Sequence, residues 1–164
     1  MVIVVPLSAL AAETVPPVRR IAVVNLDEVF KEYERTKASD TKLGAASNSK
    51  QVEREHLVSE IKSLRDELVL LNEESRAERQ QTIEQKLREL RSFDEQVKES
   101  LRKQRDESVK EILKDIEATV TSYAKEHDFD LVLNERAVLY EVEAVDITKD
   151  VLEILNGRYA KQGH

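Results

Sequence analysis

Apolar residues recur at helical spacing through about half of the chain, and short strand-like runs lie on both sides of that region. From Leu57 to Leu71, leucine and isoleucine alternate at spacings of four and three residues, with charged residues between them. This heptad stripe is typical of a helix that packs along one side against another helix. We therefore predict that residues 40–127 form long amphipathic helices.

The helical pattern is interrupted at Asn72–Ser75. Ser75, followed three residues later by Glu78, matches a capping box, in which each side chain satisfies a free backbone N–H at the start of a helix. We predict the tip of an antiparallel helical hairpin near 72–75, and a returning helix of ~75 Å at ~1.5 Å per residue. The alternative is one unbroken helix, since nothing in this segment forbids helix.

Strands are predicted before and after the arm by runs of β-branched and apolar residues between turn signals. These runs cover 21–26, 130–133 and 137–140, and residues 134–136 form a turn between the last two.

Three helix starts are predicted from side chains that can cap a helix. Asp27 begins a short helix, Ser39 or Asp40 begins the outgoing helix of the arm, and Asp146 begins a final helix that ends near Leu155.

Together these elements predict an α+β fold. Residues 21–39 and 128–158 form a small β-body, and residues 40–127 project from it as a helical hairpin arm.

The predicted β-body has too little apolar mass to be stable as an isolated unit, and its strands have edges that need covering. We therefore expect several copies of the chain to share one core. The candidate oligomerisation residues are Val23, Leu131, Leu133, Val138 and Tyr140. The alternative is an ordinary core within one chain, closed by a docked helix.

Some apolar residues of the arm fall beside the predicted seam rather than in it: Val58, Val69, Leu70 and Phe93. They are candidates for binding an unfolded polypeptide, and the alternative is that they only widen the helix–helix interface. Arg102 and Lys103 belong to a basic cluster that can attract acidic segments. The alternative there is a solvated face paired with Glu99, Asp106 and Glu107 at helical spacing.

The N-terminus has the composition of a secretory signal. Residues 1–10 are apolar apart from Ser8, and Ala9-Leu10-Ala11 has the small-x-small form of a cleavage site. We expect a signal peptide at 1–12 and an extended leader at 13–20. A frayed apolar tail is the alternative, because no Lys or Arg precedes the apolar run.

Charge and composition exclude several classes of function. The 164 residues are 36% charged and 4% aromatic with a net charge of −7, and residues 50–127 carry 16 basic and 19 acidic groups. Such a balance lacks the one-sided basic face that nucleic acid requires. The chain has no cysteine, and its three histidines share no spacing suited to a metal or a catalytic base. We expect no enzyme activity, no cofactor and no metal.

Two parts of the sequence strongly resemble the OmpH-like (Skp) family of periplasmic chaperones. One is the C-terminal run Asp130–Leu133, Ala137–Tyr140 and Asp146–Thr148 with Asp150–Leu152, and the other is Ile21–Asn25 followed by Phe30. The resemblance implies a homotrimer whose strands form a common β-body. Three helical arms would hang from that body and enclose unfolded outer-membrane proteins, without ATP or any cofactor.

The resemblance therefore implies a periplasmic holdase. The acidic balance of this chain departs from the strongly basic best-known member, so we expect weaker electrostatic capture and at most weak contact with a membrane surface. The alternative from the layout alone is a spacer or adaptor of the cell envelope that holds no client.

Overall fold

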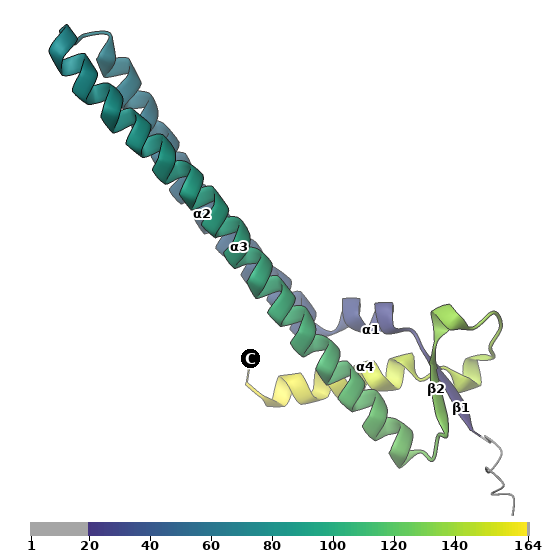
Figure 1. Cartoon of the computed structure of the whole chain (residues 1–164). Coiled ribbons are helices and arrows are strands. Elements are labelled where there is room, and N and C mark those ends of the chain that lie inside the picture. Colours follow the sequence, from purple (N-terminus) through teal and green to yellow (C-terminus); the bar gives the residue numbers. More distant parts are fainter. Residues whose placement is uncertain (1–19, 164) are drawn as a thin grey trace, which may run out of the picture.

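The computed structural model describes residues 20–163, which form a long helical arm and a small body at one end of it (Figure 1). The predicted signal peptide and residues 13–19 of the predicted leader lie outside the described residues. The elements in chain order are β1 (Ile21–Val24), α1 (Leu26–Glu32), α2 (Glu34–Leu68), α3 (Glu73–Glu126), β2 (Leu131–Asn134), two short 3₁₀ turns η1 (Glu135–Ala137) and η2 (Glu143–Val145), and α4 (Thr148–Lys161).

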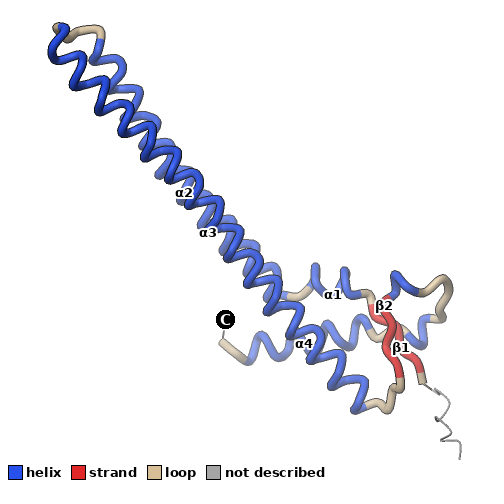
Figure 2. Tube along the Cα trace, viewed as in Figure 1, coloured by secondary structure: helices blue, strands red, loops and turns tan. Residues whose placement is uncertain are grey.

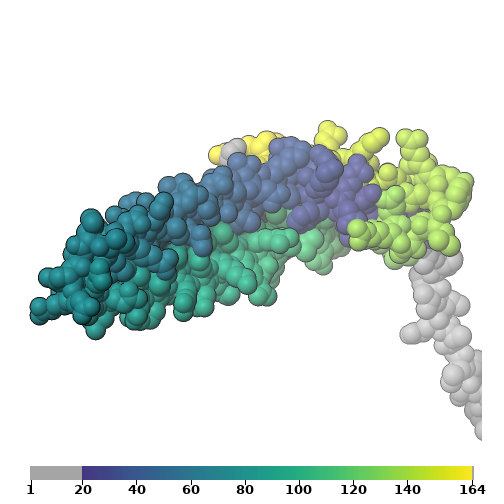
Figure 3. Space-filling view, turned by 90° about the horizontal axis from the view of Figure 1, so that it is seen from above, coloured from purple at the N-terminus to yellow at the C-terminus, as the bar shows by residue number. Residues whose placement is uncertain are grey.

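The arm is a hairpin of α2 and α3, which lie side by side along its length in two views at right angles (Figures 1 and 3). The predicted hairpin is confirmed. Its turn, however, is residues 69–72, and Asn72 rather than Ser75 caps α3. The Asn72 side chain accepts a hydrogen bond from the Ser75 backbone N–H at 3.0 Å. The predicted capping box is therefore wrong. Asn72 lies in extended backbone one residue before α3, and its side chain satisfies a free N–H of the first turn in place of Ser75.

The seam of the arm is apolar toward the tip and polar toward the body. Near the tip, Ile61 and Ile83 are 4% and 2% exposed. Closer to the body, Leu43 of α2 and the polar residues Gln104 and Ser108 of α3 line a cavity of about 420 Å³. The two helices are thus held together least well where small and polar side chains replace the leucines.

The arm joins the body through a polar cluster at its root. The Asp115 carboxylate accepts hydrogen bonds from the Tyr33 hydroxyl, at 3.2 Å, and from the Arg35 guanidinium, which also pairs with Glu111. The hydrogen bond to Asp115 raises the pKa of Arg35. Burial, together with Asp115, raises the pKa of Tyr33 to about 12.

The helix α2 begins at Glu34, earlier than the predicted start at Ser39 or Asp40. Tyr33 supplies no side-chain cap, but Asn156 of α4 accepts a hydrogen bond from the Glu34 N–H at 2.9 Å. A cap from a distant helix therefore sets this boundary.

The β-body contains one sheet of two parallel strands, shown in red in Figure 2. Ala22, Val24 and Val132 face the three helices α1, α3 and α4. The hydrophobic cluster on this face includes the fully buried Val29, Val151 and Leu155. One face of the sheet is thus covered by helices from the same chain.

Residues 137–140 are described by the structure, but they do not form the third predicted strand. Ala137 ends η1, and extended but unpaired backbone follows at Val138. A strand needs a partner for its backbone hydrogen bonds, and within one chain this segment has none. The expectation of three strands per chain is wrong, and the sheet has two.

Two other predicted caps are also corrected. Asn25 rather than Asp27 caps α1, since its side chain accepts from the Glu28 N–H at 2.9 Å. The final helix continues through Gly157 to Lys161 instead of ending near Leu155. Packing of this helix on the body overrides the local stop signal of Asn-Gly.

Candidate functional surfaces

The second face of the two-stranded sheet carries most of the predicted oligomerisation residues. Val23 is paired in register with Leu133, and Ile21 with Leu131, so these four side chains share the face opposite Ala22 and Val24. None of the four belongs to the hydrophobic cluster under the helices. Val23 is buried, whereas Ile21 and Leu131 are 43% and 40% exposed. The pattern of alternating residues had already indicated three of these positions, and it missed Ile21.

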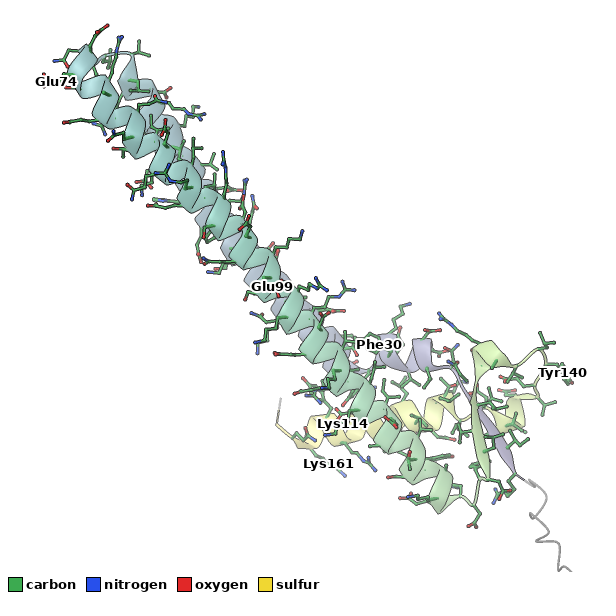
Figure 4. The ribbon with its side chains drawn as sticks, viewed as in Figure 1. Phe30, Glu74, Glu99, Lys114, Tyr140 and Lys161 are labelled. Atoms are coloured by element: carbon green, nitrogen blue, oxygen red, sulfur yellow. The ribbon has the colours of Figure 1, made fainter. Side chains whose placement is uncertain are left out.

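The segment 138–142, which we call the strap, leaves the body directly after η1. Its exposed apolar side chains are Leu139, Tyr140 and Val142, and Tyr140 is 83% exposed. Figure 4 shows Tyr140 at the end of the body away from the arm. Val138 is half-buried. The sequence analysis named Val138 and Tyr140 as oligomerisation candidates. It placed Leu139 in the same predicted strand, but it named neither Leu139 nor Val142 as a candidate.

The strap also holds one carboxylate in an unfavourable environment. The Oε2 atom of Glu141 is buried and forms no hydrogen bond with the described residues. Burial raises the pKa of Glu141, and the negative charges of Glu135 and Asp146 add to the effect. The sequence carried no signal for this group.

The strand β2 has one free edge within the described part of the chain. Its other edge is paired with β1, and β1 is bridged on its far side to Asp146. A free strand edge presents unpaired N–H and C=O groups to another chain. The strap and the second sheet face thus expose apolar side chains, and this edge of β2 exposes backbone groups that have no strand partner within the described residues.

The tip of the arm exposes two of the predicted binding residues. Val69 and Leu70 lie in the turn and are 76% and 86% exposed. A shallow groove of about 540 Å³ beside them is lined by Leu68, Val69, Arg76, Ala77 and Gln80. These side chains are therefore available to a partner.

The other two apolar candidates of the arm differ from each other. Val58 is 41% exposed. Phe93 is half-buried, lines a cavity of about 240 Å³ together with Ala46 and Val97, and has the Lys50 ammonium 5.9 Å from its ring centroid. Phe93 thus contributes to the helix–helix interface, as the alternative reading held.

Arg102 and Lys103 lie on an exposed face of α3 and form ion pairs along the helix. Arg102 is 3.7 Å from Asp106, and Lys103 is 3.9 Å from Glu107. Their side chains are 74% and 72% exposed. This arrangement favours the solvated-face alternative over a site for acidic segments.

Among residues 20–163, no three His, Asp or Glu side chains are grouped as a metal site would require. Within the same residues, no helix has the length and apolar character of a membrane span.

Comparisons with known proteins find the same arrangement of a helical arm and a small body. The family model described as outer membrane protein (OmpH-like) matches residues 20–155. The fold is similar to the crystal structure of a proposed outer membrane chaperone (OmpH-like) from Caulobacter crescentus. The TM-score is 0.78 at 14% identity, and 87% of each chain is covered. A search of curated proteins finds no match.

The family match spans most of the chain, from the residue before β1 to the middle of α4. It therefore includes the arm, both strands and the strap. The chain belongs to the outer membrane protein (OmpH-like) family.

Proposed function

We propose that this protein is an ATP-independent periplasmic holdase. It binds unfolded outer-membrane proteins in a cavity between the helical arms of a homotrimer. Family membership and the long arm carry the proposal, because the outgoing helix α2 is 35 residues, or ~52 Å at ~1.5 Å per residue. Three such arms around one body would enclose a space of that depth.

Trimer formation is supported by the apolar surface of the body. Leu139 and Tyr140 are 107% and 83% exposed, and Leu131 on the second sheet face is 40% exposed. Several exposed large apolar side chains on one small body are typical of an interface. A strap that pairs with the free edge of β2 in the next copy would give the backbone of Val138–Tyr140 the partner it lacks within one chain. Such a head-to-tail contact closes into a ring of three when each copy is rotated by 120° relative to the last.

Client binding would rest on many weak contacts. The arm exposes Val58, Val69 and Leu70 singly or in pairs, and each contributes little alone. Several arms that act on one polypeptide raise the effective concentration of every further contact. Release then follows when the client folds elsewhere, with no nucleotide involved.

The remaining features of the proposal follow from the N-terminus and the charge. Cleavage of a signal peptide at 1–12 would leave the mature protein in the periplasm. The net charge of −7 keeps attraction to anionic lipid headgroups weak. Arg102 and Lys103 form ion pairs with Asp106 and Glu107 of the same helix, so they stay secondary candidates for client contact.

The proposal is tested by diluting a denatured outer-membrane β-barrel protein into buffer with the purified mature protein and following light scattering. We expect scattering to be suppressed at about one trimer per client. Aggregation that proceeds unchanged in a stoichiometric excess of trimer would rule the holdase out.

The trimer is tested by size-exclusion chromatography with multi-angle light scattering. The mass should be three times that of one chain, and the L139S/Y140S variant should dissociate to a monomer. The matched control is V52S, because Val52 on α2 is 66% exposed and far from the body. A monomeric wild-type protein would remove the cavity and the holdase with it.

An envelope spacer or adaptor is the second candidate, and the ion pairs that link the two helices of the arm favour it. Lys86 and Glu60 are 3.1 Å apart, and Arg79 and Glu67 are 3.2 Å apart, so two ion pairs seven residues apart on each helix brace the outer arm. A spacer would show a stiff arm and one folded partner, with no suppression of aggregation.

A further inference from the structure

The charge at the tip of the arm comes from its side chains and not from the helix dipoles. In an antiparallel hairpin, the C-terminal end of α2 and the N-terminal end of α3 lie together, so their opposite dipole charges largely cancel. The carboxylates of residues 65–79 are those of Asp66, Glu67, Glu73, Glu74 and Glu78, and the cations are Arg65, Arg76 and Arg79. The tip is therefore acidic.

Two of the three arginines are engaged within the tip itself. Arg79 forms an ion pair with Glu67 at 3.2 Å, and the Arg76 Nε–H donates to the Leu68 carbonyl oxygen at 3.2 Å. The second contact satisfies a carbonyl at the end of α2 that the helix leaves free. Only Arg65 stays uncommitted.

Four of the five carboxylates remain open to a partner. Asp66, Glu73, Glu74 and Glu78 are exposed and form no ion pair within the described residues. Glu74 points outward at the end of the arm in Figure 4. These groups stand on the last turn of α2 and the first two turns of α3, on both sides of the turn. All four lie in sequence within nine residues of Val69 and Leu70, which are the most exposed apolar residues of the arm.

We propose that the tip binds an extended, unfolded polypeptide segment in which apolar residues are flanked by lysine or arginine. Val69, Leu70 and the groove lined by Leu68 and Ala77 take the apolar side chains, and the open carboxylates take the flanking cations. This inference rests on the proposed holdase function and names the class of client segment that the arm selects.

The same charges act against an anionic membrane surface. Asp66, Glu73 and Glu74 stand on the helical turns that flank Val69 and Leu70, and charges closer than a Debye length, ~8 Å at physiological salt, are only partly screened. Anionic headgroups would be repelled at the point where the apolar residues insert. A cationic polypeptide is therefore the occupant that the charges select.

The experiment measures fluorescence anisotropy of two labelled peptides with the full mature protein. Both have the core Leu-Val-Leu-Val-Leu, flanked on each side by two lysines in one peptide and by two glutamates in the other. The lysine-flanked peptide should bind at least about tenfold more tightly, and the difference should shrink in 0.5 M salt as ion pairs are screened. Equal affinities of the two peptides would overturn the proposal.

Variants locate the site. V69S/L70S should weaken binding of the lysine-flanked peptide by about tenfold, and E73Q/E74Q should weaken it by about threefold and lower its salt dependence. D66N/E78Q serves as a second charge variant, because it leaves the first turn of α3 unaltered. The matched controls are V52S and E95Q/E99Q on the middle of the arm, because Val52 is 66% exposed and is not among the candidate binding residues. If the tip variants bind as the wild type does, the site lies elsewhere and the proposal fails.

Two further measurements separate this proposal from others. Vesicles with 30% anionic lipid should not bind through Val69 and Leu70, and loss of vesicle binding in V69S/L70S would contradict the inference. Suppression of client aggregation by the wild type is scored separately. If suppression holds while the peptide preference is absent, the tip proposal alone fails; if suppression is absent, the holdase function fails.

Discussion

Arg54 of α2 and Asp94 of α3 form a two-point ion pair across the middle of the arm. The Arg54 Nε donates to Oδ1 of Asp94 at 2.9 Å, and Nη2 donates to Oδ2 at 3.3 Å. The pair lies between the apolar seam of the tip and the polar seam near the body. It links the two helices in one defined register.

This ion pair should contribute little to the free energy of unfolding, despite its two-point geometry. The two side chains are 42% and 43% exposed, so solvent screens their attraction. A double-mutant cycle of Arg54→Ala and Asp94→Ala, followed by urea unfolding, should give a coupling of ~0.5–1 kcal/mol. A coupling above ~2 kcal/mol would show that the pair is desolvated in the assembled protein.

The apolar seam near the tip should contribute far more to the stability of the arm. Ile61 and Ile83 are 4% and 2% exposed, and replacing either with alanine removes buried methyl groups and leaves a cavity. We expect Ile61→Ala and Ile83→Ala each to cost ~2–4 kcal/mol. Hydrogen exchange of amides in the outer arm should accelerate accordingly. Val58→Ala, at a 41% exposed position of the same helix, should change exchange very little.

Two glycines inside helices offer a gain in stability. Gly44 lies in α2 and Gly157 in α4, and a Cβ atom added at either position meets nothing within 4 Å. Alanine at these positions lowers the backbone freedom of the unfolded chain without a clash. Gly44→Ala and Gly157→Ala should each stabilise the protein by ~0.5–1 kcal/mol in thermal unfolding. A loss of stability in either variant would point to a neighbour that is contributed by another copy.

The protein should lose stability in strong base because of two tyrosines. Burial raises the pKa of Tyr33 and of Tyr123 from 10 to about 12, helped by Asp115 and by a hydrogen bond to Asp150 respectively. The folded state thus keeps protons that the unfolded state releases. This stabilisation is complete below pH 10 and is lost as the pH rises through 12.

The direct measurement is a spectrophotometric titration of tyrosinate. Of the four tyrosines, two should ionise late in the folded protein. Tyr33→Phe and Tyr123→Phe should each remove one late-ionising group and reduce the loss of stability between pH 10 and 12. Titration of all four together near pH 10 would contradict the burial of these hydroxyls.

Much of the arm was predictable from local pattern because helices are stabilised by contacts three and four residues apart. The stripe from Leu57 to Leu71 indicated a packed helix, and the interruption after it indicated a hairpin. The turn was placed about three residues too late, since Asn72 and Ser75 are both good caps and sequence alone does not rank them. Of the candidate binding residues, Val69 and Leu70 were indicated by their position between two seam residues. Phe93 was named for a different reason, because it stands where strict heptad register would put Asp94, and it lies in the helix–helix interface.

By itself, the sequence determined the existence and approximate length of the two arm helices, the apolar stripe that joins them and the apolar character of the strands. These properties depend on residues that are close along the chain. Only the tertiary structure decided where α2 begins, because its cap is Asn156 of α4, 122 positions away. It also decided that Ala137–Tyr140 is not a strand in one chain, since strand formation depends on a partner and not on the segment's own composition.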